Sequence, residues 1–246
     1  MCVIGKAPPN WSGVSSGLML YRRPSTPVNV GVEPELASWD QAGSPGQARL
    51  ARWLQEVDVI AAQAAPTSGP IAVALGVALP AATPLGSGGR DLDNYLLPVV
   101  QRLGARTVTA AFATKRHQPT STLAIEPARA AGEPPNSRHT ALLHGSSEGG
   151  AWKHRLRDGL VEAGVQEVPA GPTWLTAAVA TGSARVWTNL WKPLIDSLGP
   201  ILGERAENPF NAFDDRIVDL SLHHQLDTGL EHEVRIQLWW GPMPPV

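Results

Sequence analysis

The stretch RDLDNYLLPVVQRLG, from Arg90 to Gly104, has a second copy ninety-five positions later, RVWTNLWKPLIDSLG, from Arg185 to Gly199. The copies align without a gap and share five of their fifteen residues: an arginine, an asparagine, a proline, a leucine and a glycine. In both, the proline falls in or next to the first turn of an expected helix, where its missing N–H is tolerated. Such a repeat predicts an internal duplication.

The charged residues differ between the two copies in a complementary way. The first copy contains Asp91 and Asp93, and the second copy has an apolar and a hydroxyl side chain in their places. The second copy contains Lys192, where the first has Leu97. Each copy therefore lacks charged groups that the other carries.

The flanking sequence predicts the same order of elements twice: helix, strand, helix, strand, strand. Apolar residues recur every three or four positions in the expected helices and alternate in the last two strands. The first strand of each half opens with Gly-Pro. We expect these elements over 47–65, 71–79, 94–103, 107–115 and 121–128 in the first half, and over 149–164, 171–181, 189–199, 216–224 and 231–240 in the second.

This order predicts an α/β (α+β) fold of two tandem modules arranged as a pseudo-dimer. Residues 49–128 are the first module, and residues 151–246 are the second. Residues 1–48 contain many Pro and Gly and are expected to be a loop-rich N-terminal extension. Residues 129–150 are expected to be a linker.

Composition and charge narrow the class of protein. The 246 residues are 43% hydrophobic and carry a formal net charge of −2, which argues against coating nucleic acid by bulk charge. Charge is nevertheless segregated along the chain. Nine Lys or Arg against three Glu give +6 between residues 102 and 157, whereas eight Asp or Glu stand against three Arg after residue 203.

Cysteine usage and hydropathy predict a cytoplasmic protein. Cys2 is the only cysteine, so no internal disulfide can form, which suits a reducing compartment. The first ten residues lack the apolar run of a signal peptide. The longest apolar run, nine residues from Ile71, is about half of what a membrane span needs.

Asp91 and Asp93 are candidates for a metal site. On an extended segment, residues i and i+2 point the same way, and two carboxylates so placed can hold one hard divalent cation such as Mg²⁺. The Gly-rich segment before them, PLGSGGR, lets the backbone approach a ligand closely. The alternative is that Asp93 or Asn94 caps the following helix while Asp91 is solvated.

The second half supplies Asp214, Asp215 and Lys192 as candidates. The paired aspartates precede the expected strand over 216–224, either as metal ligands or as an exposed turn. Lys192 lies in the first turn of its expected helix, where a cation opposes the helix dipole. A phosphate contact would explain that placement, and extension of the side chain into solvent is the alternative.

Other chemical motifs are missing from the sequence. It contains no GxSxG elbow, no P-loop and no GxGxxG fingerprint. His223 and His224, with His232 across an expected hairpin, invite a zinc interpretation, but no Cys or carboxylate completes a ligand set. Four of the nine tryptophans are expected in the core or the module interface rather than as base-stacking platforms: Trp187, Trp191, Trp239 and Trp240.

In combination, these residues resemble the RusA family of Holliday junction resolvases, which are crossover junction endodeoxyribonucleases. The family pattern is approximately D-x-D-N-x-x-K-P-x-x-D-x-L, followed after a loop by D-D-x-x-I/V. The first half matches it as DLDNYLLPVVQRLG, and the second as NLWKPLIDSLG and DDRIVDL. The resemblance covers residues 49–240. It implies small α/β homodimers that cut four-way DNA junctions with Mg²⁺.

By this resemblance the metal ligands fall on Asp91, Asp93, Asp214 and Asp215, and the catalytic residues on Asp91, Asp93, Lys192 and Asp215. Neither half contains the whole set. One hypothesis is that the fused pseudo-dimer forms one composite site, an endonuclease for branched DNA that uses Mg²⁺ or, alternatively, Mn²⁺. The other is that both sites are broken, and that the chain binds DNA or protein without nuclease activity.

The implied partner is branched or four-way junction DNA. Its phosphates would be held by basic side chains of the positively charged region and its neighbours: Arg90, Lys115, Arg116, Lys153, Arg155 and Arg157. The chain would act as a monomeric pseudo-dimer or as a homodimer, and no membrane partner is expected.

Overall fold

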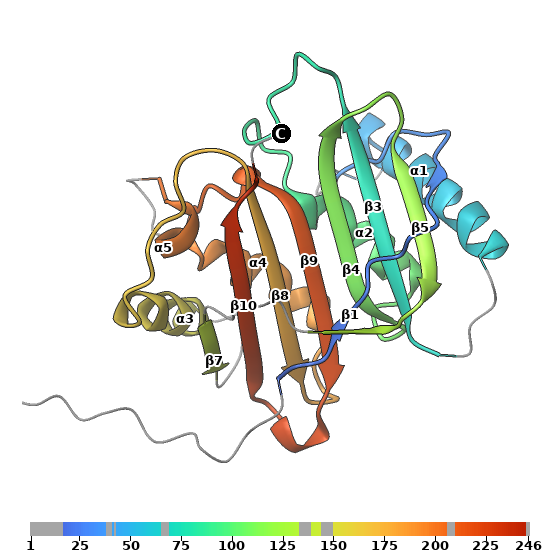
Figure 1. Ribbon diagram of the computed structural model, residues 1–246. Coiled ribbons are helices and arrows are strands. Elements are labelled where there is room, and N and C mark those ends of the chain that lie inside the picture. The colour runs from blue at the N-terminus through green and yellow to red at the C-terminus, as the bar shows by residue number, and fades with distance from the viewer. Residues whose placement is uncertain are drawn as a thin grey trace, which may run out of the picture.

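An eight-stranded mixed sheet forms the centre of the protein (Figure 1). The structure is a computed structural model, which describes residues 17–37, 41, 43–64, 69–132, 139–143, 150–205 and 210–244. In spatial order the strands are β2 (Val28–Asn29), β5 (Thr122–Pro127), β3 (Ile71–Leu79), β4 (Val108–His117), β9 (Ile217–Leu226), β8 (Thr173–Thr181), β10 (Val234–Pro242) and β7 (His139–Leu143). β3 pairs with β4, and β8 with β9, in parallel, whereas the central pair of β4 and β9 is antiparallel.

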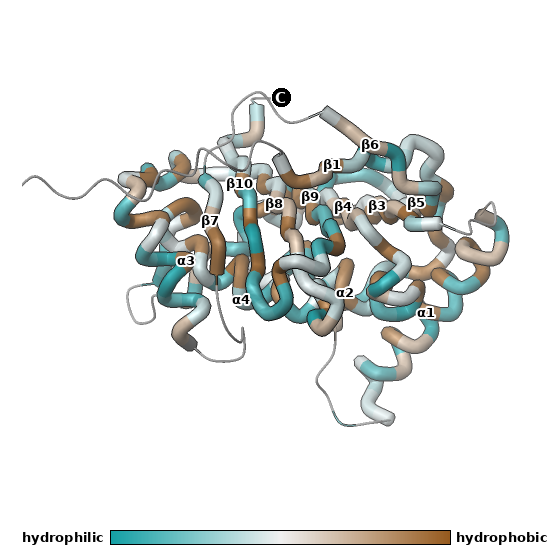
Figure 2. The backbone as a smooth tube through the Cα atoms, turned by 90° about the horizontal axis from the view of Figure 1, so that it is seen from below, coloured by the Kyte–Doolittle hydropathy of each residue, from teal (hydrophilic) through white to brown (hydrophobic). Residues whose placement is uncertain are grey.

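Helices cover one face of this sheet, and the N-terminal segment crosses the other (Figure 2). The helices on the covered face include α1 (Pro45–Gln63), α2 (Leu92–Leu103), α3 (Gly150–Glu162) and α4 (Trp191–Asp196). Shorter pieces of the second half are η1 (Trp187–Leu190), α5 (Gly199–Leu202), η2 (Asp214–Arg216) and η3 (Thr228–Leu230). On the opposite face β1 (Leu20–Tyr21) pairs with β6 (Ala130–Ala131). No helix of the described residues is both long and apolar enough to cross a bilayer.

The main core lies between the helices and the sheet and includes residues of both halves of the chain. α1 begins after Ser44, whose hydroxyl accepts a hydrogen bond from the Gln47 N–H, and a proline in the first turn has no N–H to leave unsatisfied. Trp53 and Val57, on one side of α1, are fully buried against this core. Because the core is continuous, the two expected modules are not separate globules.

The central rung of the β4–β9 ladder pairs Phe112 with Ser221. The parallel neighbours select the same two residues. Phe112 lies opposite Ala74, the fourth residue of β3, and Ser221 lies opposite Thr176, the fourth residue of β8. This agreement supports an approximate twofold relation between the two halves of the sheet.

The outer strands follow the same relation. In both β3 and β8, the register against the parallel neighbour slips between the first and the second residue of the strand. The first residue of β3 pairs with Pro127 at the end of β5, and the first residue of β8 pairs with Pro242 at the end of β10. The two halves thus share strand order, pairing direction, an irregularity and a proline position. These features confirm an α+β fold and support the predicted duplication, which stays an inference.

The helix expected over 189–199 is wrong in detail, since η1, α4 and α5 divide this region. Two local causes are visible. The Ser197 hydroxyl donates to the Pro193 carbonyl at 2.6 Å, which competes with the helical backbone ladder. Pro200 has no N–H to donate to the preceding turn, which disfavours continuation of the helix at this point.

Segments expected to be extension and linker contribute strands to the fold. β1 and β2 come from residues 1–48, and β6 and β7 come from residues 129–150. β2 pairs with β5 at one edge of the sheet, and β7 pairs with β10 at the other. These segments are thus part of the sheet system on both sides.

Arg216 fixes the start of β9 and with it the preceding aspartates. Its side chain is 9% exposed, and its guanidinium donates to the carbonyls of Gly171, Leu202, Val168 and Pro169. These carbonyls belong to the loop before β8 and to the end of α5. A planar group with five donors can satisfy several acceptors at once, which an ammonium group cannot do in this geometry.

We expect Arg216→Met to lower the free energy of unfolding by about 3–5 kcal/mol, because it leaves several buried carbonyls without a donor. Arg235→Met is the matched control, since Arg235 lies on β10, is half-buried and makes one ion pair, with Asp227 at 3.8 Å. The control should cost less than about 1 kcal/mol. Urea unfolding followed by circular dichroism measures both, and equal losses would contradict this role of Arg216.

Candidate functional site

The start of α2 carries two of the predicted acidic residues. Asp91 is the residue before the helix and has extended backbone angles. The Asn94 side-chain amide donates to Asp91 Oδ2 at 3.2 Å, whereas Asp91 Oδ1 is buried and has no hydrogen-bond partner among the described residues. Asp93 is 4% exposed and lies inside the first turn of α2. The expectation that both lie on one extended segment is therefore wrong, because the helix begins at Leu92.

Lys115, at the end of β4, joins this segment to the second half. Its side chain is 1% exposed, and its Nζ donates to the Arg90 carbonyl at 2.9 Å and to the Asp215 carbonyl at 2.8 Å. Burial lowers the pKa of Lys115 to about 8, and the charges of Asp91 and Asp215 act against that shift. Lys115 is thus the buried connection between the loop before α2 and the turn before β9.

Lys192 reaches the same place from α4. Its Nζ lies 2.6 Å from Asp214 Oδ2 and 3.1 Å from Asp196 Oδ1. Asp196 in turn pairs with Lys153 of α3 at 2.6 Å, so four alternating charges form a chain from α3 to η2. Burial works against the charge of Lys192, but Asp214, together with Asp93 and Asp196, outweighs it and raises the pKa of Lys192.

The acidic residues of the two halves share one electrostatic environment. Burial raises the pKa of Asp93 to about 7, and Asp214 and Asp91 add to that rise while Lys192 opposes it. Burial also raises the pKa of Asp91, again with a contribution from Asp214 across the boundary between the halves. The charges of Asp91, Asp93, Lys192 and Asp214 therefore act on one another across the boundary between the halves, and the Asp215 carbonyl is joined to this region through Lys115. We call these five residues, with Lys115, the acidic site.

The residues of the acidic site fit a divalent cation in charge. Four carboxylates against two ammonium groups leave −2 when all are ionised, which a divalent cation would balance. The unpartnered Asp91 Oδ1 and the desolvated Asp93 are both oxygen donors of the kind that Mg²⁺ prefers. Two features work against a closed metal centre. Lys192 already neutralises Asp214, and the described residues include no group of three or more His, Cys, Asp or Glu that could hold a metal ion.

The basic residues predicted to bind DNA have different placements. Lys115 does not fit that role, because its ammonium group is buried and used by two carbonyls. Lys153 pairs with Asp196, and Arg157 pairs with Glu204 at 2.7 Å. Of the others, Arg90 is half-buried, directly before the acidic site, and two are exposed: Arg116 and Arg155.

The two adjacent histidines of β9 do not form a zinc pair. His223 accepts from the Tyr21 N–H at 3.2 Å on the face that β1 crosses. His224 points to the helix-covered face, where its Nε2 lies 2.9 Å from the Thr181 hydroxyl and its ring stacks on Trp187. The four tryptophans expected in the interior, Trp187, Trp191, Trp239 and Trp240, are all buried.

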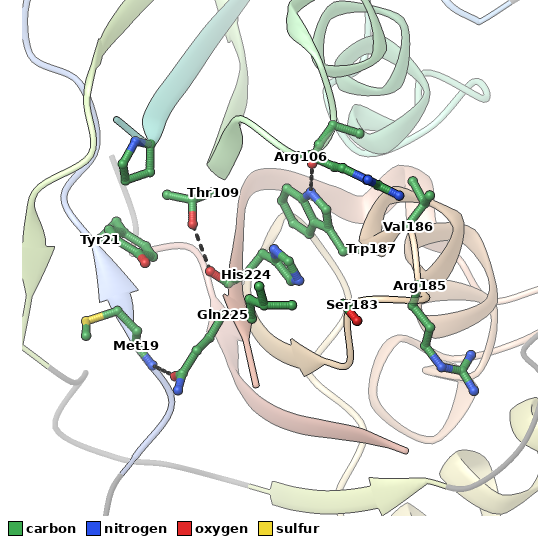
Figure 3. Close-up of a pocket in the computed structure, with 13 residues that line it drawn as sticks. Met19, Tyr21, Arg106, Thr109, Ser183, Arg185, Val186, Trp187, His224 and Gln225 are labelled. Atoms are coloured by element: carbon green, nitrogen blue, oxygen red, sulfur yellow. Dashed lines mark hydrogen bonds between the residues drawn. The ribbon is translucent and has the colours of Figure 1, made fainter. Parts of the chain in front are cut away.

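Sequence reasoning missed Asp196, the buried position of Lys115, and a pocket at the other end of the β4–β9 pair (Figure 3). Asp196 follows Lys192 by four residues, a helical spacing that could have indicated the ion pair. The pocket had no such signal, because its walls come from segments more than a hundred residues apart.

Asp93 should make the stability of the metal-free protein fall with rising pH. Its pKa is about 7 in the folded state and 3.8 as the unperturbed value, so the folded state binds more protons than the unfolded state between these values, and stability decreases through this window. Between pH 5 and pH 8 the free energy of unfolding of the wild type should fall by an amount on the order of 2 kcal/mol because of Asp93. We expect this fall to be absent in Asp93→Asn.

The control for this experiment is Asp58→Asn, an exposed carboxylate on α1 whose lowered pKa lies outside the window. Buried His223 and His224 shift stability in the opposite direction in all three proteins, so the difference between variants isolates Asp93. Urea titrations in EDTA at several pH values supply the data. If the free energy of unfolding changes with pH in the same way for the wild type and Asp93→Asn, the pKa of Asp93 is not raised in the folded state.

Comparisons of the chain with protein-family models, with curated proteins and with solved structures find no match. The resemblance to the RusA family therefore stays a prediction, and the functional conclusion rests on the geometry of the acidic site.

Proposed function

We propose that the acidic site is a composite, metal-dependent endonuclease centre that acts on branched DNA, as the resemblance to the RusA family implies. One observation carries this proposal. The charges of Lys192 and Asp214 in the second half act on Asp91 and Asp93 of the first half, and Lys115 joins the Arg90 and Asp215 carbonyls beside them. The charged groups that each repeat lacks are thus supplied by the other repeat at one place.

In this proposal Asp91 and Asp93 hold a Mg²⁺ or Mn²⁺ ion, with Asp214 and Asp215 as further acidic groups. When bound, such an ion lowers the pKa of a water molecule and stabilises negative charge on a phosphate. The reaction adds one water across a phosphodiester: a P–O bond forms to the water oxygen, the P–O bond to the leaving group breaks, and the leaving oxygen takes up a proton.

The protein's own residues position these groups. Lys115 holds the Arg90 and Asp215 carbonyls, which fixes the loop before α2 against the turn before β9. Lys192 orients Asp214, and its side chain is 49% exposed, so a phosphate can approach its ammonium group from solvent.

A second candidate function is binding of branched DNA without cleavage. It is favoured by the ion pair between Lys192 and Asp214, which already neutralises one proposed ligand. It is also favoured by the finding that no group of three metal-ligating side chains is close enough within the described residues. In that case the acidic site would be a structural remnant, held together by Lys115 and Lys192.

The two functions differ in one measurement. We expect the protein to cut a labelled four-way DNA junction in Mg²⁺ or Mn²⁺ but not in EDTA, and to leave a linear duplex of the same sequence intact. Asp93→Asn should reduce the cleavage rate by about a hundredfold or more, because it removes a charged ligand from the reacting centre. Denaturing gel electrophoresis of time points gives the rates.

The matched control is Asp58→Asn, the same chemical change at an exposed carboxylate that pairs with Arg102 at the far end of α2. It should cleave like the wild type. Junction binding without cleavage in either metal, unchanged in Asp93→Asn, would support the second candidate and rule out the first.

A further inference from the structure

A pocket of about 490 Å³ lies at the end of β9, away from the acidic site, with Met19 and Tyr21 of the N-terminal segment on one side and Trp187 on the other (Figure 3). Its walls come from both halves of the chain. Thr109 and Arg106 of the first half lie at the start of β4, and Trp187 and His224 belong to the second half. The Thr109 hydroxyl donates to the His224 carbonyl at 2.9 Å, and Trp187 Nε1 donates to the Ala105 carbonyl at 2.8 Å.

This pocket is the symmetry counterpart of the acidic site. The exchange of β4 and β9 about Phe112 and Ser221 puts His224 where Lys115 stands and Arg106 where Asp215 stands. Both places therefore have the same construction, in which the end of one central strand meets the turn before the other. Hydrogen bonds connect the halves at both places.

The alignment of the two repeated segments, which does not depend on strand pairing, also relates the pocket to the acidic site. Aligning the two copies puts Arg185 at the place of Arg90 and Val186 at the place of Asp91. Arg185 and Val186 both line the pocket. Thr188, which takes the place of Asp93, is buried, and its hydroxyl has no hydrogen-bond partner among the described residues.

The side chains at these corresponding positions give the pocket a positive charge, whereas those of the acidic site give it a negative charge. Within the described part of the chain, no carboxylate lines the pocket, whereas Arg106 and Arg185 both do. His224 is uncharged at neutral pH, because burial lowers its pKa to about 4. Arg185 is held by the His232 carbonyl, and the Arg106 side chain is exposed. The pocket therefore suits an anion and cannot hold a divalent cation.

The rest of the lining is apolar. Met19, Val186 and Leu226, three of the few large apolar side chains that the described residues expose, all lie here, with exposed fractions of 45%, 37% and 58%. The Trp187 and His224 rings stack nearly parallel beside them. Two arginines next to an apolar wall match a ligand with an anionic group attached to a flat, weakly polar body, which describes a nucleotide.

We propose that this pocket binds a nucleotide of a DNA strand, with its phosphate at Arg106 and its base against the apolar wall, and does not cut it. The choice of DNA as the source of the nucleotide rests on the proposed function. The anionic, flat chemistry of the ligand rests on the pocket alone. Together they predict that the acidic site cuts one strand of a symmetric junction while the pocket holds the strand related by symmetry.

Direct binding tests the pocket separately from any cleavage. The probes are 5′-phosphorylated trithymidylate and uncharged thymidine, titrated by calorimetry in EDTA so that no metal participates. We expect the trinucleotide to bind at least about tenfold more tightly than thymidine, and Arg106→Glu to weaken it by about tenfold or more, since repulsion replaces attraction at the phosphate.

Two further variants serve as controls. Arg52→Glu makes the same charge change at an exposed position on α1 and should bind like the wild type. Val186→Asp places a carboxylate in the pocket wall and should weaken binding as Arg106→Glu does, while the circular dichroism spectra and unfolding midpoints of both variants should match those of the wild type.

The outcomes separate this inference from the proposed function. The nucleotide-binding role of the pocket is refuted if Arg106→Glu and Arg52→Glu bind the trinucleotide equally well. It is also refuted if the protein binds the trinucleotide and thymidine with equal affinity. Both conclusions hold whether or not the junction is cut. Intact binding with no cleavage in any metal supports the pocket and overturns only the nuclease. If cleavage occurs, a nick in one strand of a symmetric junction supports the pocket as a holding site, and cuts in two opposite strands contradict it.

Discussion

The antiparallel pairing of β4 with β9 is the interaction on which the rest of the structure depends. It joins two four-stranded halves into one sheet, with Phe112 and Ser221 at the centre of the ladder. Because the strands run in opposite directions, the end of each lies beside the turn that precedes the other. Lys115 can therefore reach the Asp215 carbonyl, and Thr109 can reach the His224 carbonyl. Without this pairing, each half would keep an incomplete set of charged groups.

The symmetry of the backbone contrasts with the divergence of the side chains. At one end, burial and neighbouring charges raise the pKa values of Asp91 and Asp93, Lys192 pairs with the Asp214 carboxylate, and Lys115 donates to two backbone carbonyls. At the other end, the corresponding places carry arginine, valine and histidine, and the walls are open and partly apolar. The two ends of the β4–β9 pair thus carry different side chains on a similar backbone arrangement.

Sequence reasoning predicted the fold class, the repeated order of elements and the complementary loss of charges, because these depend on local patterns and on comparison of the chain with itself. It failed where distant segments decide the outcome. Lys115 stands at the end of an expected strand and was predicted to bind DNA. In the structure it is buried, and its ammonium group binds the carbonyls of Arg90 and Asp215. The strand at 139–143 is short, and only its pairing with β10 makes it a strand. The pocket is formed by positions with no common motif.

The long separation between the two central strands has a consequence for synthesis of the protein. About a hundred residues lie between Phe112 and Ser221, so on the ribosome β4 emerges well before its partner and remains an unpaired edge in the meantime. The contact that completes the sheet has a high sequence separation and forms late, because loop closure must precede it. Both the acidic site and the pocket straddle this seam, so neither exists in a nascent chain until translation has passed β9.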